Sequence, residues 1–368
     1  MRIGILTFHN AHNYGAVLQA YALKTWLEHN SKYEVEIINY KNKVIQKKYN
    51  YSLVVYIGKK DLFFPWRWKI LWDKLCFIKN AQKQWAVQWE KFDDFITDNL
   101  IIDNDSEVSA GEWFDYDLII LGSDQIWEKK ATLGYDKVYF GDIKTKAKII
   151  SYAASMSDIN LNENDVMYIK NKLNKLDAIS VREDTIQDFL INILNKDVFK
   201  VLDPTLLLDK CEYQKLSRKV NNMPYEKYVL VYYVNEDKGL EQYIKKLKKN
   251  NCINIIEIHY YNKKKYNPVF QLSDVGPGEF LYLIDNASFV ITNSFHGVAF
   301  SIIYNKNFYT YYKKNDRAES LMNVLGIYNR NQYIKESSSF DEIDYIKVNN
   351  QIRELRKNSE NFLKTNIN

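Results

Sequence analysis

The beginning of the chain alternates strand-like and helix-like segments in a way that restricts the fold. Residues 2–8 (RIGILTF) and 34–40 (EVEIINY) are short and apolar enough for buried strands, and the segment between them repeats small and apolar residues every three or four positions, as a helix does. Two strands joined through a helix form a parallel pair with a right-handed crossover. The first turn carries only Gly15, so the glycine pattern of dinucleotide-binding folds is missing and a nicotinamide or flavin enzyme is not expected.

The same alternation continues along most of the chain. Further segments expected to be strands are residues 117–121, 148–154, 178–182, 200–202, 228–234, 253–259, 289–291 and 308–312. Their nearly uninterrupted apolar composition is typical of strands that helices cover on both faces. We therefore predict an α/β protein with two Rossmann-like lobes that face a cleft. The predicted parts are an amino-terminal lobe (1–210), a carboxy-terminal lobe (211–343) and a terminal helix (344–368) with little core.

Residues 45–115 interrupt this alternation with an aromatic insertion. Six of the eight tryptophans fall within this region, five of them among lysines and arginines. The helical periodicity of residues 64–96 predicts two helices that pack on the core. The alternative is an aromatic and basic surface that makes peripheral contact with a membrane or with a lipid-linked substrate.

Composition excludes several classes of protein. A net charge of +5 spread over 368 residues is too dilute to predict nucleic-acid binding. The three cysteines, Cys76, Cys211 and Cys252, are too far apart for a disulfide framework or a zinc site, and no metal is expected. Met1 leads directly into a strand, which argues against a signal peptide, and no run of about 18 apolar residues predicts a membrane span. We expect a cytoplasmic protein, with membrane association as the alternative.

Residues 289–304 (FVITNSFHGVAFSIIY) are the most informative stretch for function. They predict a buried strand, a polar turn and a helix whose buried face includes Phe295. His296 lies off this face in the first helical turn, and Gly297 beside it leaves room for an approaching group. A helix N-terminus after a strand favours an anion. The alternative is a structural histidine beside a helix cap.

Polar residues also follow the other strands, where open α/β sheets bind ligands. Arg182 can bind a carboxylate or phosphate in bidentate geometry. Alternatively, it forms only an ion pair with Glu183 or Asp184. Arg317 can cap its own helix or reach into the cleft. The Gly122–Gln125 turn can cradle a sugar or be only a tight turn, and Asn13 and Gln19 are ambiguous in the same way. The residues by themselves predict a two-lobed α/β protein with an anion site.

Seven motifs, in order along residues 1 to about 328, carry a resemblance to a known family. They are MRIGILTFHNAHNYGAVLQAYAL, LGSDQIW, ISYAASMS, ISVREDT, VLDPTLLL, ITNSFHGVAFSIIY and NDRAESLMNVLGI. Together they resemble the polysaccharide pyruvyl transferase family. The resemblance implies a GT-B-like fold and an enzyme of capsule, exopolysaccharide or cell-wall glycan synthesis. Such enzymes transfer pyruvate from phosphoenolpyruvate to two hydroxyls of one sugar as a cyclic ketal and release phosphate.

The resemblance also implies roles for residues. His296 is the expected general acid, because a histidine pKa lies near neutrality, and Arg182 is the expected anion clamp. The implied donor-binding residues are Asn293, Ser294, Phe295, Gly297 and Arg317, and the implied acceptor-binding residues are Asn13, Gly15, Gln19, Ser123, Asp124 and Gln125. No cofactor is implied, since phosphoenolpyruvate is the donor substrate, and the sugar acceptor is nucleotide- or lipid-linked.

One departure from the family pattern leaves alternatives open. Many members have Arg-Leu-His where this chain has Ser294–Phe295–His296, and Arg317 can replace the missing charge. A GT-B-type glycosyltransferase that uses a nucleotide sugar is the second candidate, with Glu279 as the residue that would hold a ribose. A glycan-binding scaffold is the third.

Overall fold

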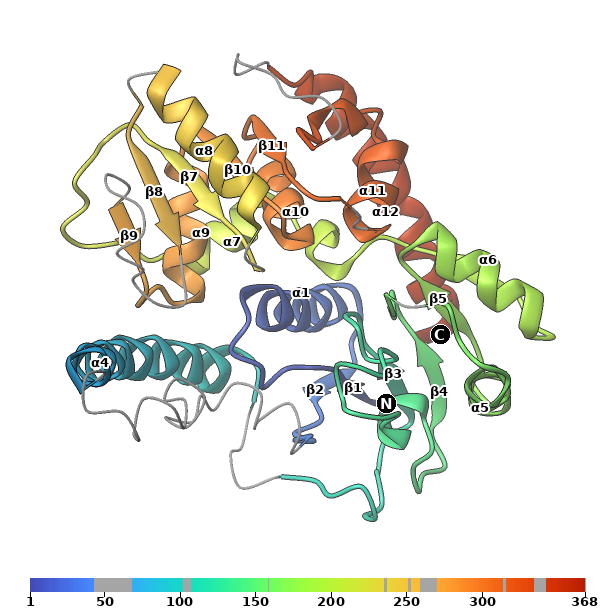
Figure 1. Cartoon of the computed structure of the whole chain (residues 1–368). Helices are drawn as coiled ribbons and strands as arrows, with labels where there is room; N and C mark the ends of the chain where they lie inside the picture. Colours follow the sequence, from blue (N-terminus) through green and yellow to red (C-terminus); the bar gives the residue numbers. More distant parts are fainter. Residues whose placement is uncertain are drawn as a thin grey trace.

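The structure is a computed structural model of the chain. It describes residues 1–42, 68–101, 107–157, 159–234, 237–250, 253–258, 270–313, 316–333 and 342–367, and within helix α4 it describes side chains at residue 83 and from residue 85 onward. Two α/β lobes lie one above the other in Figure 1, with helix α1 (Tyr14–Asn30) between them.

The amino-terminal lobe is built on parallel strands. β1 (Arg2–Leu6), β2 (Glu34–Ile37), β3 (Leu118–Leu121) and β4 (Lys148–Ser151) form a sheet in the order β2-β1-β3-β4. The parallel pair β5 (Ile179–Val181) and β6 (Val198–Lys200) continues it through single bridges to Ile150 and Ala154. Helices α5 (Glu163–Leu173) and α6 (Asp184–Ile193) and the short turns η3 (Lys137–Phe140) and η4 (Pro204–Leu207) complete the lobe.

The carboxy-terminal lobe repeats this design. Its sheet is entirely parallel, in the order β11-β10-β7-β8-β9. The strands are β7 (Val229–Tyr232), β8 (Ile255–Ile258), β9 (Phe270–Leu272), β10 (Phe289–Thr292) and β11 (Phe308–Thr310). The helices are α7 (Lys210–Leu216), α8 (Lys238–Asn250), α9 (Pro277–Asn286), α10 (Phe295–Ile303), α11 (Asp316–Val324) and α12 (Tyr345–Ile367), with the short turn η5 (Tyr328–Arg330). The predicted α/β architecture of two Rossmann-like lobes is confirmed.

The aromatic insertion differs from its prediction. Residues 68–99 form one continuous helix, α4 (Trp68–Asn99), and not two. No glycine or proline interrupts this stretch, so nothing in its sequence ends the helix early. The prediction of a membrane-facing aromatic surface falls mostly on side chains outside the described residues.

Helix α12 also differs from its prediction, because it has a substantial buried face. Val348, Ile352, Phe362, Leu363 and Ile367 are buried. In Figure 1 the helix runs from the carboxy-terminal lobe back to the amino-terminal lobe. There Ser359 Oγ accepts a hydrogen bond from Leu202 N at 2.8 Å. The helix therefore ties the two lobes together.

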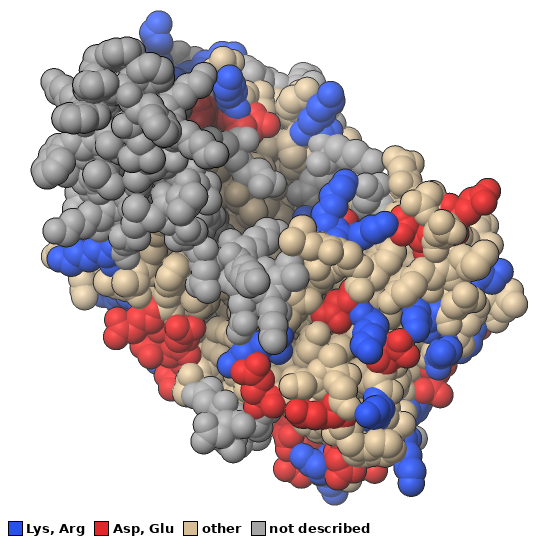
Figure 2. Space-filling model, turned by 60° about the horizontal axis from the view of Figure 1, so that its bottom comes forward, with Lys and Arg blue, Asp and Glu red and all other residues tan. Residues whose placement is uncertain are grey.

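Surface charge is mixed on the face drawn in Figure 2. Lysine and arginine side chains alternate there with aspartate and glutamate, so on this face the net charge of +5 is not gathered into one basic patch. No helix in the described part of the chain combines the length and apolar character that crossing a membrane requires.

Candidate active site

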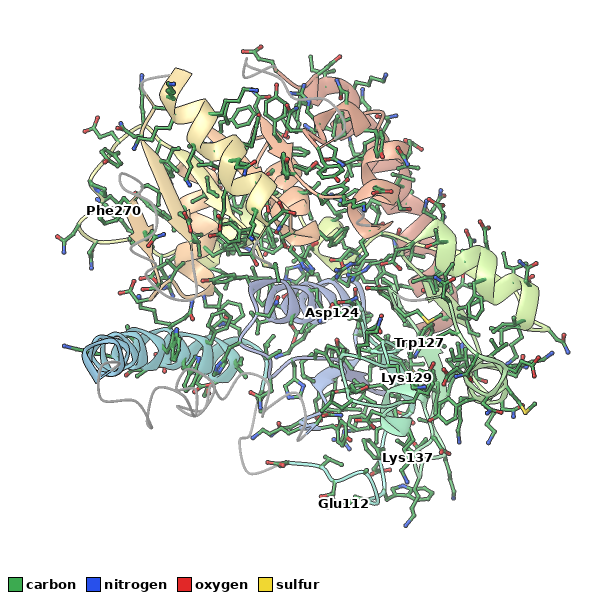
Figure 3. All side chains as sticks on the ribbon, viewed as in Figure 1. Glu112, Asp124, Trp127, Lys129, Lys137 and Phe270 are labelled. Carbon is green, nitrogen blue, oxygen red and sulfur yellow. The ribbon has the colours of Figure 1, made fainter. Side chains whose placement is uncertain are left out.

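Four chain segments bring polar and ionisable side chains together where the lobes meet. Ser123 follows β3, Arg182 follows β5, Asp203 follows β6, and His296 opens α10 of the other lobe. The carboxyl ends of parallel strands share one sheet edge, which explains why residues so distant in sequence are neighbours. Arg182 and His296 are each 6% exposed and Asp203 is 2% exposed. In Figure 3 Asp124, from the same turn as Ser123, lies on the side of its lobe near α1, whereas Glu112 and Lys137 lie on the far side.

Arg182 is the centre of this cluster. Its Nε donates a hydrogen bond to Glu183 Oε1 at 2.9 Å, and its Nη1 donates to Asp203 Oδ2 and, at 3.2 Å, to Ser123 Oγ. Its Nη2 makes no hydrogen bond and lies 3.7 Å from Asp124 Oδ1. Burial lowers the pKa of the guanidinium, but Glu183, Asp203 and Asp124 outweigh it and raise this pKa. The ion-pair role that the sequence left open for Arg182 is therefore present in the structure.

Asp203 is a site residue that the sequence analysis did not select. Its Oδ1 accepts hydrogen bonds from Thr205 N at 3.0 Å and Thr205 Oγ1 at 2.7 Å, and its Oδ2 accepts from Ser123 Oγ at 3.0 Å. Burial raises the pKa of this carboxyl, but Arg182, His296 and the Thr205 hydrogen bonds together lower it. Its place directly after a strand was the signal that could have identified it.

His296 lies where the two lobes meet, and its Nε2 faces Asp203. Its Nε2 is buried, has no hydrogen-bond partner and lies 3.9 Å from Asp203 Oδ2. The opposite side of the ring packs closely on Gly15. A Cβ added to Gly15 would lie 1.9 Å from His296 Nδ1. Burial lowers the pKa of the imidazole to about 4 against the opposing effect of Asp203, so His296 is neutral at pH 7 without a ligand.

Arg317, in the first turn of α11, adds a second cation that lacks a direct partner among the described residues. It is partly buried and forms no hydrogen bond or ion pair with the described residues. Burial and the nearby Arg182 lower the pKa of its guanidinium, while Asp124, Glu183 and Asp203 raise it. The N-terminus of α10 is open as well, because Ser294 makes no side-chain capping hydrogen bond. The Arg317 guanidinium and the backbone N–H groups at the start of α10 are therefore the groups of this site that an anion can bind.

Three predicted donor-binding residues have other contacts. The open side of Gly297 faces Thr292, since a Cβ on Gly297 would lie 2.2 Å from Thr292 Oγ1. The expected room beside His296 is thus filled by the strand. Phe295 packs under the Arg182 guanidinium, whose carbon lies 4.8 Å from the ring centroid. Asn293 Oδ1 accepts a hydrogen bond from Val234 N at 3.0 Å.

Among the predicted acceptor-binding residues, only Ser123 and Asp124 join the charged cluster, and Gly15 borders it through His296. Asn13 caps α1 by accepting from Ala16 N at 3.2 Å. Gln19 is fully buried and donates to Thr7 Oγ1 and Ala16 O, both at 2.9 Å. Gln125 donates to Ser157 Oγ. In this structure Asn13 and Gln19 have the structural roles that their sequence also allowed.

Comparisons with solved structures give only distant likenesses. A search of curated proteins finds no match. Among solved structures, the UDP-GlcNAc 2-epimerase of Methanocaldococcus jannaschii in complex with UDP-GlcNAc and UDP is 13% identical, with a TM-score of 0.47 and coverage of 97% of this chain and 100% of that one. The Neisseria meningitidis UDP-GlcNAc 2-epimerase bound to UDP-GlcNAc is 10% identical, with a TM-score of 0.49 and coverage of 97% and 99%. The E. coli heptosyltransferase WaaC with ADP-2-deoxy-2-fluoro heptose is 10% identical, with a TM-score of 0.38 and coverage of 86% and 90%.

The match in sequence is more specific than these distant likenesses. The sequence model of the family described as polysaccharide pyruvyl transferase matches residues 13–314, which include every charged residue of the cluster except Arg317. The chain belongs to the polysaccharide pyruvyl transferase family, transferases of polysaccharide biosynthesis.

Proposed function

We propose that this protein transfers pyruvate from phosphoenolpyruvate to two hydroxyls of one sugar as a cyclic ketal, in a capsule, exopolysaccharide or cell-wall glycan precursor. Family membership supports this function. The observation that carries it is the partly buried Arg317, which has no ion pair or hydrogen bond with the described residues and faces the same cluster as His296. A ligand with two anionic groups, such as phosphoenolpyruvate, would supply the direct ion pair that Arg317 lacks.

The chemistry needs one proton carrier and no bound cofactor or metal. The methylene carbon of phosphoenolpyruvate gains a proton, and a sugar hydroxyl forms a C–O bond at the neighbouring carbon. The second hydroxyl then replaces phosphate at that carbon. Of the two hydroxyl protons, one replaces the proton delivered to carbon and the other leaves with phosphate. We assign His296 as the carrier, because a bound phosphate would raise its pKa from about 4 and allow it to hold a proton.

The glycosyltransferase alternative loses its candidate ribose-binding residue. Both carboxylate oxygens of Glu279 lie 2.7 Å from Lys91 Nζ, and Oε2 also accepts from Gly276 N at 2.8 Å, at the start of α9. This carboxylate is thus engaged in joining α4 to α9. For the acceptor, we propose a nucleotide- or lipid-linked sugar used in the cytoplasm, with peripheral membrane contact if the carrier is a lipid.

Thermal unfolding with and without millimolar phosphoenolpyruvate tests the donor assignment. A ligand at one hundred times its dissociation constant adds about 2.7 kcal/mol of stability. We expect a clear rise of Tm in the wild type and none in Arg317→Ala, whose unliganded Tm stays close to that of the wild type because no described ion pair is lost. Arg182→Ala is a poor test, since leaving buried carboxylates without their cation costs about 3–5 kcal/mol by itself.

Arg353→Ala, on the exposed side of α12, is the matched control and should keep the full shift. A shift with a nucleotide sugar but none with phosphoenolpyruvate would favour the glycosyltransferase. A shift with the oligosaccharide alone would favour a glycan-binding scaffold. Glycan-dependent phosphate release and a new ketal methyl signal in the product would establish the reaction itself.

A further inference from the structure

Asp203 has no assigned part in the proposed chemistry, yet it is the most firmly held carboxylate of the site. All four groups that donate to it belong to its own lobe, and three of them are uncharged: the Thr205 N–H, the Thr205 hydroxyl and the Ser123 hydroxyl. The fourth is the Arg182 guanidinium. Pro204, at the first position of η4, fixes the backbone beside it.

The partner that Asp203 faces comes from the other lobe. His296 Nε2 lies 3.9 Å from Asp203 Oδ2, and no other described carboxylate lies within 4.0 Å of the ring nitrogens. This separation is too long for a hydrogen bond but short enough for a strong charge interaction in a buried site. A buried nitrogen without a partner, beside a rigid carboxylate, is arranged to hold a proton once that proton arrives.

We propose that Asp203 is the positioning residue of His296: its carboxylate faces His296 Nε2 and stabilises the protonated imidazole during ketal formation. This role rests on the proposed function. Asp203 takes no proton itself. Its negative charge lowers the free-energy cost of protonating the buried imidazole. Because Asp203 belongs to one lobe and His296 to the other, the pair exists only while the lobes are in contact.

The other charged groups near His296 act differently. Asp124 adds a weaker attraction for the imidazolium, while Arg182 and Arg317 repel it. Glu183 is engaged with Arg182 and with Ser155 Oγ at 2.7 Å. Loss of the Asp203 charge therefore leaves His296 with two cations and one more distant carboxylate.

The test measures the pKa of His296 directly and does not depend on turnover. The protein has five histidines, so carbon-13 labelling of histidine gives few NMR signals, and the loss of one signal in His296→Asn assigns it. We expect Asp203→Asn, which keeps the size of the side chain, to lower the pKa of His296 by about one unit or more. Asp142→Asn removes the same charge at a remote, partly exposed ion pair with Lys172 and should leave this pKa unchanged.

Kinetics supply the second readout. If protonated His296 is the active form, activity falls as pH rises through its pKa, and Asp203→Asn should move this fall to lower pH by the same amount. The kcat should fall while KM for phosphoenolpyruvate does not rise, because removing a negative charge does not weaken anion binding. A merely structural role would not separate kcat from KM in this way.

Thr205→Val is a second variant that tests the proposal if Asp203→Asn does not fold. It removes only the Thr205 hydroxyl bond that holds Asp203 Oδ1 and leaves the carboxylate in place, so the pKa of His296 should change by less than in Asp203→Asn. An unchanged His296 pKa in both variants would overturn the role of Asp203, even if phosphoenolpyruvate proves to be the donor. If phosphoenolpyruvate is not the donor, the NMR titration still decides whether the two residues are coupled.

Discussion

Gly15 shows how a single residue can be recognised from sequence while its neighbour in the fold is not. The sequence places it at the start of a helix after the first strand, and we expected it to contact the acceptor. In the structure its missing side chain makes room for the His296 ring of the other lobe. No local pattern carries this information, because the two residues are separated by most of the chain. The anion-binding character of the segment around His296, by contrast, could be predicted from a strand end and a helix start alone.

Gly15→Ala sets two effects against each other. Alanine favours a helix over glycine by about 1 kcal/mol, which by itself would raise stability. The added Cβ would lie 1.9 Å from His296 Nδ1, and overpacking of this kind costs about 1–3 kcal/mol. We expect the clash to dominate, so that Tm falls and the phosphoenolpyruvate-induced shift is lost. Gly111→Ala, where a Cβ meets nothing within 4 Å, is the control; a stabilised and fully responsive Gly15→Ala protein would contradict the packing described here.

Helices and strands could be predicted where the residues within them are sufficient to specify them. Strands such as β3 and β10 are apolar on both faces and were found from composition, whereas β9 is short and none of its three residues is fully buried, so it was missed. The prediction of two helices for the region of α4 was wrong, although no glycine or proline interrupts residues 68–99, and the contacts of α4 with both lobes were not predictable. Gln88 of α4 donates to Tyr14 Oη at 3.1 Å and to Val275 O at 3.2 Å. Tertiary contacts of this kind leave no trace in local periodicity.

The contact between α4 and α9 gives a prediction for the insertion. Lys91 Nζ bonds Asp274 O at 2.8 Å as well as the Glu279 carboxylate, so Lys91→Ala should destabilise the protein, with coupling to Glu279→Gln of about 0.5–3 kcal/mol in a double-mutant cycle. Glu279→Gln should keep its response to phosphoenolpyruvate. Lys83→Ala, exposed on the same helix, should change neither property. If the effects of the two substitutions on the free energy of urea unfolding are additive, the contact between Lys91 and Glu279 does not stabilise the protein.

The whole molecule has a core that does not stop at the predicted lobe boundary. One continuous cluster of buried apolar side chains includes Leu18 of α1, Leu230 of β7, Phe280 of α9 and Phe362 of α12. Tyr14 stacks on Phe280 with ring centroids 4.5 Å apart and donates its hydroxyl to Val275 O at 2.8 Å. The alternation of strands and helices predicted two lobes correctly, but it could not show that they share buried surface, since packing between distant segments depends on the whole fold.

Shared burial predicts how the protein unfolds. Two lobes with separate cores would melt in two steps, whereas lobes that share a core and are bridged by α12 should unfold together. We expect one calorimetric transition whose calorimetric and van't Hoff enthalpies agree. We also expect that the fragment 1–210 does not fold alone, because it would expose the surfaces of α1 and η4 that α9, α10 and α12 cover. Two separated transitions, with a fragment 1–210 that melts at the lower or upper one, would mean that each lobe is stable without the other. His296 would then be able to leave Gly15 and Asp203 without unfolding either lobe.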